Sequence, residues 1–205
     1  MIHVLVVDDH PAVRAGLVAM LRAEPGLVPV ASAADPEAAM AAARRTRPDV
    51  AIVDYYLKVG DGLAVCRQLK SLPAVPRVLI YSAFAEWGLW LPAAVAGADG
   101  LVDKGAPSDE LFERVRTLAR GETVLAITPE AMTAGAAKLE TDDLPVLGLM
   151  MDRTPRAEIA EVLGLEEHEL ERRIDAMLIR LTDPGDRDGL TPRGVTPRES
   201  VRSGP

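Results

Sequence analysis

Short apolar runs alternate with longer helical patterns over residues 2–120 of the chain. Each run is rich in valine, isoleucine and leucine and is too short for a buried helix, so it is typical of a strand covered on both faces of a parallel sheet. The expected strands are 3–7, 27–32, 50–54, 77–82 and 100–104. This alternation predicts an α/β fold in which five parallel strands form a doubly wound sheet with helices on both faces.

Helical patterns fill the segments around these strands. The expected helices start at Pro11 and at Pro36 and lie within 59–70, 84–96 and 107–120. Asp35 is placed to cap the second helix, whereas Pro92 should interrupt the fourth because proline lacks a backbone N–H. The apolar positions expected to be buried are Val13, Leu17, Met20 and Leu21 in the first helix, Ala39, Met40 and Ala43 in the second, and Leu111, Phe112, Val115 and Leu118 in the fifth.

The chain changes character after residue 121. Residues 1–121 form the predicted α/β domain, 122–142 read as a linker that is partly helical, and 143–182 contain only helical patterns. The last region predicts a helix, a tight turn at Gly164 and a second helix, with Ile159, Val162, Leu163 and Leu165 packing on Leu170, Ile174, Met177 and Leu178. Residues 183–205 have almost nothing to bury, so a disordered tail is expected.

The composition is that of a folded protein. Of the 205 residues, 48% are hydrophobic and 26% are charged, which excludes coiled-coil, collagen-like and wholly disordered chains. No apolar run is long enough to cross a membrane, and the acidic start MIHVLVVDDH does not resemble a signal peptide. The single cysteine, Cys66, lies among apolar residues and is expected in the core. We therefore expect a cytoplasmic protein that makes no membrane contact.

Acidic residues are concentrated towards the C-terminus. The formal net charge is −8 at pH 7, and residues 123–182, with 12 acidic and 6 basic residues, carry most of it. Domains that bind DNA mainly by neutralising phosphates are usually basic. The charge of this segment therefore argues against a DNA interface.

Polar side chains stand at the carboxyl ends of the predicted strands. Asp8 and Asp9 end the first strand, Asp54 the third and Ser82 the fourth, and Lys104 follows the fifth. Ligands of open parallel sheets bind at this edge, so the five side chains should meet in one crevice. Taken singly, an Asp pair is more often a helix cap and a lysine is usually solvated; their joint placement favours a functional site. Crowded carboxylates need a cation, and Mg²⁺ prefers oxygen ligands.

Four motifs resemble the receiver domain of two-component response regulators. They are VDDH (7–10), VDYYLKVGDGL (53–63), YSA (81–83) and Gly97-Ala98 followed by Lys104. The resemblance covers residues 1–121 and implies a flavodoxin-like sheet in which Asp54 accepts a phosphoryl group from a sensor histidine kinase. It further implies that Lys104 pairs with the phosphoryl oxygens and that Ser82 hydrogen-bonds one of them. The implied Mg²⁺ ligands are Asp9, Asp8 through water, Asp54 and the backbone carbonyl of Tyr56.

Three positions depart from the receiver pattern. Leu101 stands where an aromatic switch residue is common, so a rotating ring cannot report phosphorylation there. Lys58 stands where a proline is common, which loosens the loop without affecting the chemistry. Trp87 and Trp90 fall within about one helical turn, and we leave open whether one of them belongs to the core or both mark a partner surface.

The C-terminal region resembles a LuxR-type helix-turn-helix domain, most clearly in EIAEVLGL (158–165). In that family the second helix enters the major groove. Here its exposed positions include Glu166, Glu167, Glu169 and Glu171, and the expected DNA contacts are His168, Arg172 and Arg173. Pairing of the two arginines with Glu169 and Asp175 within the helix is an equally good interpretation. The segment after Thr182 replaces the final helix that usually forms the homodimer contact.

These features support two functional hypotheses. In the first, the chain is a response regulator in which phosphorylation of Asp54 controls a helix-turn-helix domain that binds promoter DNA, as a monomer or as a homodimer. In the second, the degenerate helical domain contacts another protein and has lost DNA binding. A phosphatase ranks third because Tyr56 stands where a second Asp would be needed. No enzymatic activity is expected beyond slow hydrolysis of the chain's own aspartyl phosphate.

Overall fold

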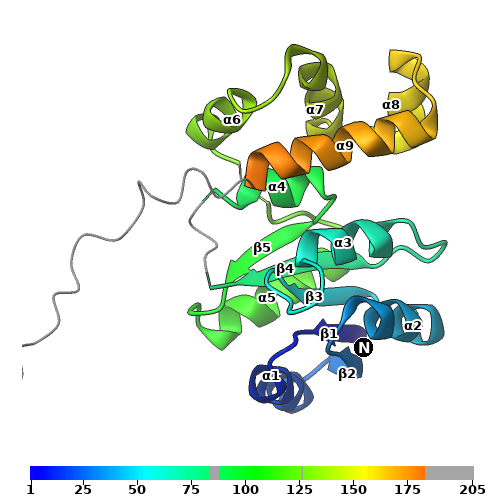
Figure 1. Cartoon of the computed structure of the whole chain (residues 1–205). Coiled ribbons are helices and arrows are strands. Elements are labelled where there is room, and N and C mark those ends of the chain that lie inside the picture. Colours follow the sequence, from blue (N-terminus) through cyan, green and yellow to red (C-terminus); the bar gives the residue numbers. More distant parts are fainter. Residues whose placement is uncertain (84–87, 126, 183–205) are drawn as a thin grey trace, which may run out of the picture.

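The computed structural model describes residues 1–83, 88–125 and 127–182, and its centre is a five-stranded sheet (Figure 1). The strands are β1 (Ile2–Val7), β2 (Leu27–Ala33), β3 (Val50–Asp54), β4 (Arg77–Ser82) and β5 (Gly100–Asp103). They pair in parallel in the order β2-β1-β3-β4-β5. The predicted strands and the doubly wound α/β fold are thus confirmed.

Five helices cover this sheet. They are α1 (Pro11–Ala23), α2 (Pro36–Thr46), α3 (Gly62–Lys70), α4 (Trp90–Val95) and α5 (Ser108–Ala119). Buried side chains of α1 and α5 share one hydrophobic cluster with the sheet, and those of α2, α3 and α4 share the other. Asp35 caps α2 as predicted, because its Oδ1 accepts a hydrogen bond of 2.8 Å from the backbone N–H of Ala38.

Two expectations for these helices were wrong. Val13 and Met20 of α1 are 36% and 37% exposed, because the buried stripe of this helix is narrower than predicted and consists of Leu17 and Leu21. Pro92 does not interrupt α4. It lies in the first turn, where a backbone N–H has no partner within the helix. Residues 84–87, where part of this helix was expected, lie outside the described residues.

The C-terminal region is entirely helical where it is described. It consists of α6 (Pro129–Ala136), the 3₁₀ turn η1 (Thr141–Asp143), α7 (Leu144–Met151), α8 (Arg156–Leu163) and α9 (Glu167–Thr182). Gly164 ends α8 with a φ of 64°, which confirms the predicted tight turn. Val162 was expected in the helix contact but is 61% exposed, whereas Ile159 is fully buried. The expected disordered tail falls outside the described residues.

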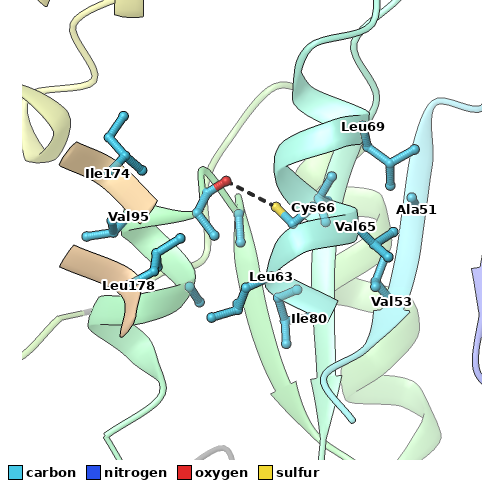
Figure 2. Packing of buried hydrophobic residues seen from close by; sticks show 14 of the residues in the cluster. Ala51, Val53, Leu63, Val65, Cys66, Leu69, Ile80, Val95, Ile174 and Leu178 are labelled. Carbon is cyan, nitrogen blue, oxygen red and sulfur yellow. Dashed lines mark hydrogen bonds between the residues drawn. The ribbon is translucent and has the colours of Figure 1, made fainter. Parts of the chain in front are cut away.

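The C-terminal helices pack directly on α4 (Figure 1). Ile174 and Leu178 of α9 lie beside Val95 of α4 (Figure 2), and all three belong to the cluster that also covers the α3 face of the sheet. Gly135 permits a close approach of α6, since a Cβ built there would lie 2.0 Å from Cδ2 of Leu91. The division of the chain at residues 121 and 142 stays a prediction about independent folding units.

Cys66 belongs to this shared core, as predicted. It is fully buried on α3, and its Sγ donates a hydrogen bond of 3.5 Å to the carbonyl of Ala96 (Figure 2). Burial raises the pKa of the thiol to about 12, so Cys66 is protonated and unreactive at neutral pH. No helix within the described residues has the length and apolar character needed to span a bilayer.

Candidate functional site

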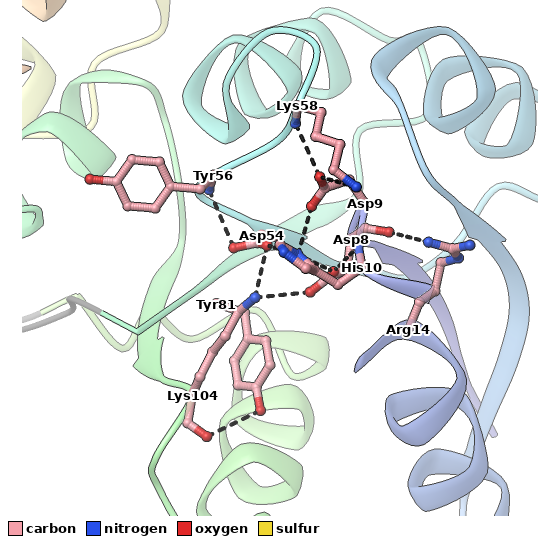
Figure 3. Close-up of polar contacts among 9 residues, drawn as sticks. All are labelled: Asp8, Asp9, His10, Arg14, Asp54, Tyr56, Lys58, Tyr81 and Lys104. Carbon is pink, nitrogen blue, oxygen red and sulfur yellow. Dashed lines mark hydrogen bonds and ion pairs between the residues drawn. The ribbon is translucent and has the colours of Figure 1, made fainter. Parts of the chain in front are cut away.

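Three carboxylates meet at the carboxyl edge of the sheet (Figure 3). Asp8, Asp9 and Asp54 are only 1%, 8% and 3% exposed. Asp8 and Asp9 follow β1, and Asp54 is the last residue of the adjacent strand β3. Because neighbouring parallel strands end at the same edge, residues 46 positions apart in sequence share one small volume.

The loop after Asp54 depends on a glycine. A Cβ at Gly62 would lie 2.2 Å from the backbone oxygen of Asp54, so only glycine allows α3 to begin this close to the end of β3. Asp61 caps α3 by accepting a hydrogen bond of 2.7 Å from the backbone N–H of Ala64. The Asp61-Gly62 pair therefore fixes the position of the loop that borders the acidic cluster.

Lys104 supplies the positive charge at the centre of this cluster. Its Nζ lies 2.9 Å from Oδ2 of Asp8 and 2.8 Å from Oδ2 of Asp54 (Figure 3). Its chain neighbour Asp103 ends β5, which brings the lysine to the same edge as the carboxylates. The sequence prediction that Asp8, Asp9, Asp54 and Lys104 would meet in one place agrees with this geometry.

Burial and charge act on the pKa values in opposite directions here. Burial raises the pKa of Asp54 above its usual value of 3.8, and the hydrogen bond and charge of Lys104 offset only part of this effect. Burial alone would lower the pKa of Lys104, but its hydrogen bonds to Asp54 and Asp8 outweigh burial and raise it. The lysine therefore stays charged at neutral pH, while Asp54 is more basic than an exposed aspartate.

The cluster has the donor set of a hard cation site. One ligand atom from each of Asp8, Asp9, His10 and Asp54 lies within 4.8 Å of the others. Oδ1 of Asp9 is buried and accepts no hydrogen bond from the residues that the structure describes. Nδ1 of His10 lies 2.8 Å from it without hydrogen-bond geometry, and pairs with it only when the imidazole is protonated. A buried carboxylate oxygen without a donor is satisfied by a cation, so the residues fit a bound metal ion.

Ser82 and Tyr56 also lie near Asp54. Ser82 is fully buried at the end of β4, the strand next to Asp54. The backbone N–H of Tyr56 donates a hydrogen bond of 3.3 Å to Oδ1 of Asp54. The Tyr56 ring points away from the carboxylates in Figure 3 and is 44% exposed as a residue. The backbone of Tyr56 is thus closer to the acidic cluster than its side chain.

Sequence reasoning missed three neighbours of this cluster. The first is Tyr81 of β4. The Nζ of Lys104 lies 5.4 Å from the centre of the Tyr81 ring, a distance suited to a cation–π contact. The backbone N–H of Lys58 donates a hydrogen bond of 3.2 Å to Oδ2 of Asp9. The third is His10. Tyr81 belongs to the YSA motif and His10 to VDDH, so both were within motifs that pointed to the site.

The residues expected to contact DNA lie on α9 and do not form a basic patch. His168 and Arg172 are exposed, and Arg172 makes no ion pair within the described ranges. Arg173 donates a hydrogen bond of 3.0 Å to the carbonyl of Asp142. Asp175, the expected partner of Arg172 within the helix, pairs instead with Arg67 of α3. That part of the intrahelical interpretation is therefore wrong.

The acidic side of α9 contacts the sheet-bearing part of the chain. Glu171 accepts hydrogen bonds of 2.5 Å from Arg67 of α3 and 2.5 Å from Arg156 of α8. Burial acts to raise the pKa of Glu171, but the two guanidinium groups outweigh it and hold the pKa below its usual value. Arg67 of α3 therefore pairs with two carboxylates of α9, Glu171 and Asp175. Glu171, one of the four glutamates that looked unfavourable for DNA, thus binds an arginine of the same chain.

Known proteins resemble this chain along most of its length. Residues 4–116 match the family model for the response regulator receiver domain. The chain is 33% identical to the DNA-binding transcriptional activator DevR/DosR of Mycobacterium tuberculosis, with 88% of each chain covered. It is 27% identical to the response regulator UvrY of Escherichia coli, covering 91% of this chain and 90% of UvrY.

Solved structures that resemble this chain include proteins of the same kind. A LuxR-family two-component response regulator from Aurantimonas sp. is 29% identical and superposes with a TM-score of 0.58, covering 65% of this chain and 94% of that one. These relatives support the interpretation as a transcription regulator and give no support to the protein-interaction alternative. The chain belongs to the two-component response regulators that regulate transcription, with a receiver domain at its N-terminal end.

Proposed function

We propose that Asp54 accepts a phosphoryl group from a sensor histidine kinase and that this event controls binding of the C-terminal helices to promoter DNA. The observation that carries the proposal is the position of Asp54, which is buried at the sheet edge with Nζ of Lys104 only 2.8 Å away. A kinase and promoter DNA are intracellular partners, so we place the protein in the cytoplasm.

The chemistry follows from the groups around Asp54. A carboxylate oxygen of Asp54 attacks the phosphorus of a phosphohistidine, the P–N bond breaks as the P–O bond forms, and the leaving imidazole takes up a proton. The backbone N–H of Tyr56 holds Oδ1 of the nucleophile. Lys104 then exchanges its contact with Asp54 for the phosphoryl oxygens, and Ser82 hydrogen-bonds one of them. Slow attack by water on the aspartyl phosphate restores the starting state.

The proposed Mg²⁺ ligands are Asp9, Asp54, the backbone carbonyl of Tyr56 and, through water, Asp8. The buried Oδ1 of Asp9 supports this assignment because no hydrogen bond from the described residues satisfies it. When bound, Mg²⁺ supplies positive charge against the phosphoryl oxygens.

Mass spectrometry of the intact chain tests the phosphoacceptor. Incubation with a small phosphodonor and Mg²⁺ should add one phosphoryl group to the wild type and none to Asp54→Asn. Asp61→Asn is the matched control, because it makes the same change in the loop that follows Asp54 and asparagine still caps α3. The control should be labelled like the wild type. Equal labelling of Asp54→Asn would refute the assignment.

Regulation of DNA binding is supported by the position of α9. Its apolar face packs on α4, and Glu171 and Asp175 contact Arg67 of α3. Since α9 is the helix expected to enter the major groove, and the sheet-bearing part of the chain lies against it, we infer that α9 leaves α3 and α4 before it enters the groove. Phosphorylation would shift the chain towards this open state, in which two copies could form a homodimer on one site.

Arg67→Ala tests this inference. Loss of the guanidinium leaves Glu171 and Asp175 without their partner on α3, so the open state should become more populated. We expect the unphosphorylated variant to bind promoter DNA about tenfold more tightly than the wild type, in a manner that weakens steeply with salt. Arg22→Ala, which removes an exposed arginine of α1, should change nothing. No binding at low salt in any form, phosphorylated or not, would favour the protein-interaction alternative.

A further inference from the structure

A cavity lies where the C-terminal helices meet the sheet-bearing part of the chain. Its volume is about 500 Å³, within the range of pockets that bind small molecules. Its walls come from the turn between α4 and β5, from the segment that precedes α6, and from the turn between α7 and α8. The apolar part of the lining includes Ala94, Leu125, Ile127, Met150, Met151 and Ile159.

The charged part of the lining is mostly positive. Lys70, Arg153 and Arg156 face the cavity, together with one carboxylate, Asp99. That carboxylate is already neutralised. It is 4% exposed, pairs with Lys70, and accepts hydrogen bonds of 2.8 Å from Arg77 and 2.8 Å from the backbone N–H of Val78. The cavity therefore offers positive charge beside an apolar wall, with no free negative charge from Asp99.

The two arginines differ in what they already bind. Nη1 of Arg156 donates a hydrogen bond of 2.5 Å to Oε1 of Glu171. Arg153 makes no ion pair with any residue that the structure describes, and its φ of 60° presents it from a left-handed turn between α7 and α8. Arg153 is exposed, so its guanidinium at the edge of the cavity is available to bind a carboxylate, sulfonate or phosphate group.

We propose that this cavity binds a small amphipathic anion, with its charged group at Arg153 and its apolar body against Met150, Met151 and Ile159. Methionine side chains adapt to ligands of different shape, which suits a body without polar groups. The ligand would be an organic acid with an alkyl or aromatic portion, because the lining combines the positive charge of Arg153 with apolar side chains.

Binding should be coupled to the position of α9. Lys70, Ala94 and Asp99 belong to the sheet-bearing part, whereas Arg153, Arg156 and Ile159 belong to the C-terminal helices, so the cavity exists only while the two parts are packed together. A ligand that binds only one conformation stabilises it. The anion would thus oppose release of α9, a consequence that rests on the proposed function, although binding itself does not.

The test measures binding alone, on the full unphosphorylated chain and without DNA. The probe is 1-anilinonaphthalene-8-sulfonate, titrated by fluorescence and by calorimetry, and its uncharged counterpart is N-phenyl-1-naphthylamine. We expect one saturable site for the sulfonate and binding at least about tenfold weaker for the uncharged compound, because one charge-assisted contact is worth about that factor. Octanoate should displace the probe.

Matched variants locate the site. Arg153→Asn should weaken sulfonate binding about tenfold, and asparagine tolerates the left-handed backbone of this position. Ala94→Trp should abolish binding by filling the cavity while leaving every charge in place. Arg45→Ala, at an exposed position of α2, is the control and should bind like the wild type. Circular dichroism verifies that each variant is folded.

Two results would overturn the proposal. One is equal affinity for the sulfonate and the uncharged compound, which would mean that the arginines contribute nothing. The other is binding that does not saturate or that persists unchanged in folded Arg153→Asn and Ala94→Trp. Neither result bears on phosphorylation of Asp54, so failure here and failure of the proposed function are distinguishable.

Discussion

Lys104 holds two buried carboxylates together before any phosphoryl group arrives. Its contacts with Asp8 and Asp54 offset part of the burial of both groups, and the same contacts raise its own pKa. A buried charge that loses its partner is strongly destabilising. In the proposed function, phosphorylation of Asp54 would replace one carboxylate partner of Lys104 with a phosphoryl group, so the lysine would exchange partners without being left unpaired.

At the same scale, the partners of Glu171 account for one of the four glutamates of the predicted recognition helix. Its two oxygens bind Arg67 and Arg156, which lie on different helices and far apart in sequence. The sequence showed the charge of Glu171 but not its partners, because Arg67 precedes it by 104 residues and only the fold brings them together. The local pairing rule therefore offered only partners within the same helix.

The lowered pKa of Glu171 predicts how the packing of α9 depends on pH. The contribution of this carboxylate should be complete above its usual pKa of 4.5 and lost as the pH falls through the lowered value in the folded chain. Urea unfolding of the wild type and of Glu171→Gln measures the effect. At pH 7 the wild type should be more stable, and the difference should shrink as the pH falls below 4.5. A constant difference from pH 7 to 3 would contradict the assigned ion pairs.

At the scale of the element, α4 joins the two parts of the molecule. This helix of six residues packs on the sheet through one side and receives α6, α7 and α9 on the other. Leu91, 2% exposed, lies under Gly135 of α6. The fourth helix of a receiver is therefore almost wholly enclosed here, and movement of the C-terminal helices requires this contact to open.

Two glycines of the C-terminal helices test that contact. Gly135→Val should lower the free energy of unfolding by about 1–3 kcal/mol, because a Cβ there would meet Leu91 and overpack the interface. Gly148→Val in α7 is the matched control, since nothing lies within 4 Å of a Cβ at that position. Its effect should stay within about 0.5 kcal/mol. Urea unfolding measures both, and equal losses would show that the α6–α4 contact has no special role.

Elements with a strong local pattern were predictable from the sequence. The continuous apolar runs at β3 and β4 gave their bounds correctly, and Asp35-Pro36 marked the start of α2. The width of the buried face of α1 was overestimated. Periodicity identifies the apolar positions of a helix, but it does not show how many of them the neighbouring elements cover. The packing of α9 on α4 could not be predicted from the sequence. The apolar residues of α9 were already explained by a contact with α8, so no further partner was needed.

At the scale of the whole molecule, the described structure has α9 packed against α3 and α4, which is the closed state of the proposed function. The acidic cluster and α9 lie on different elements, connected through α3 and α4. We propose that phosphorylation of Asp54 releases α9 from these two helices. Leu101, which is 1% exposed in β5, cannot act as the rotating aromatic switch, so release must begin from other contacts near Ser82 and Lys104.

The fluorescence emission of Trp90 tests the release of α9 most directly. It is partly buried against the shared core on α4, and replacing Trp87 by Phe leaves it as the only tryptophan of the chain. We predict that a phosphodonor with Mg²⁺ shifts Trp90 emission to longer wavelength in Trp87→Phe, because loss of α9 exposes the indole to water. The Trp87→Phe, Asp54→Asn variant should show no shift. Unchanged emission from a chain that mass spectrometry shows to be fully phosphorylated would contradict the account.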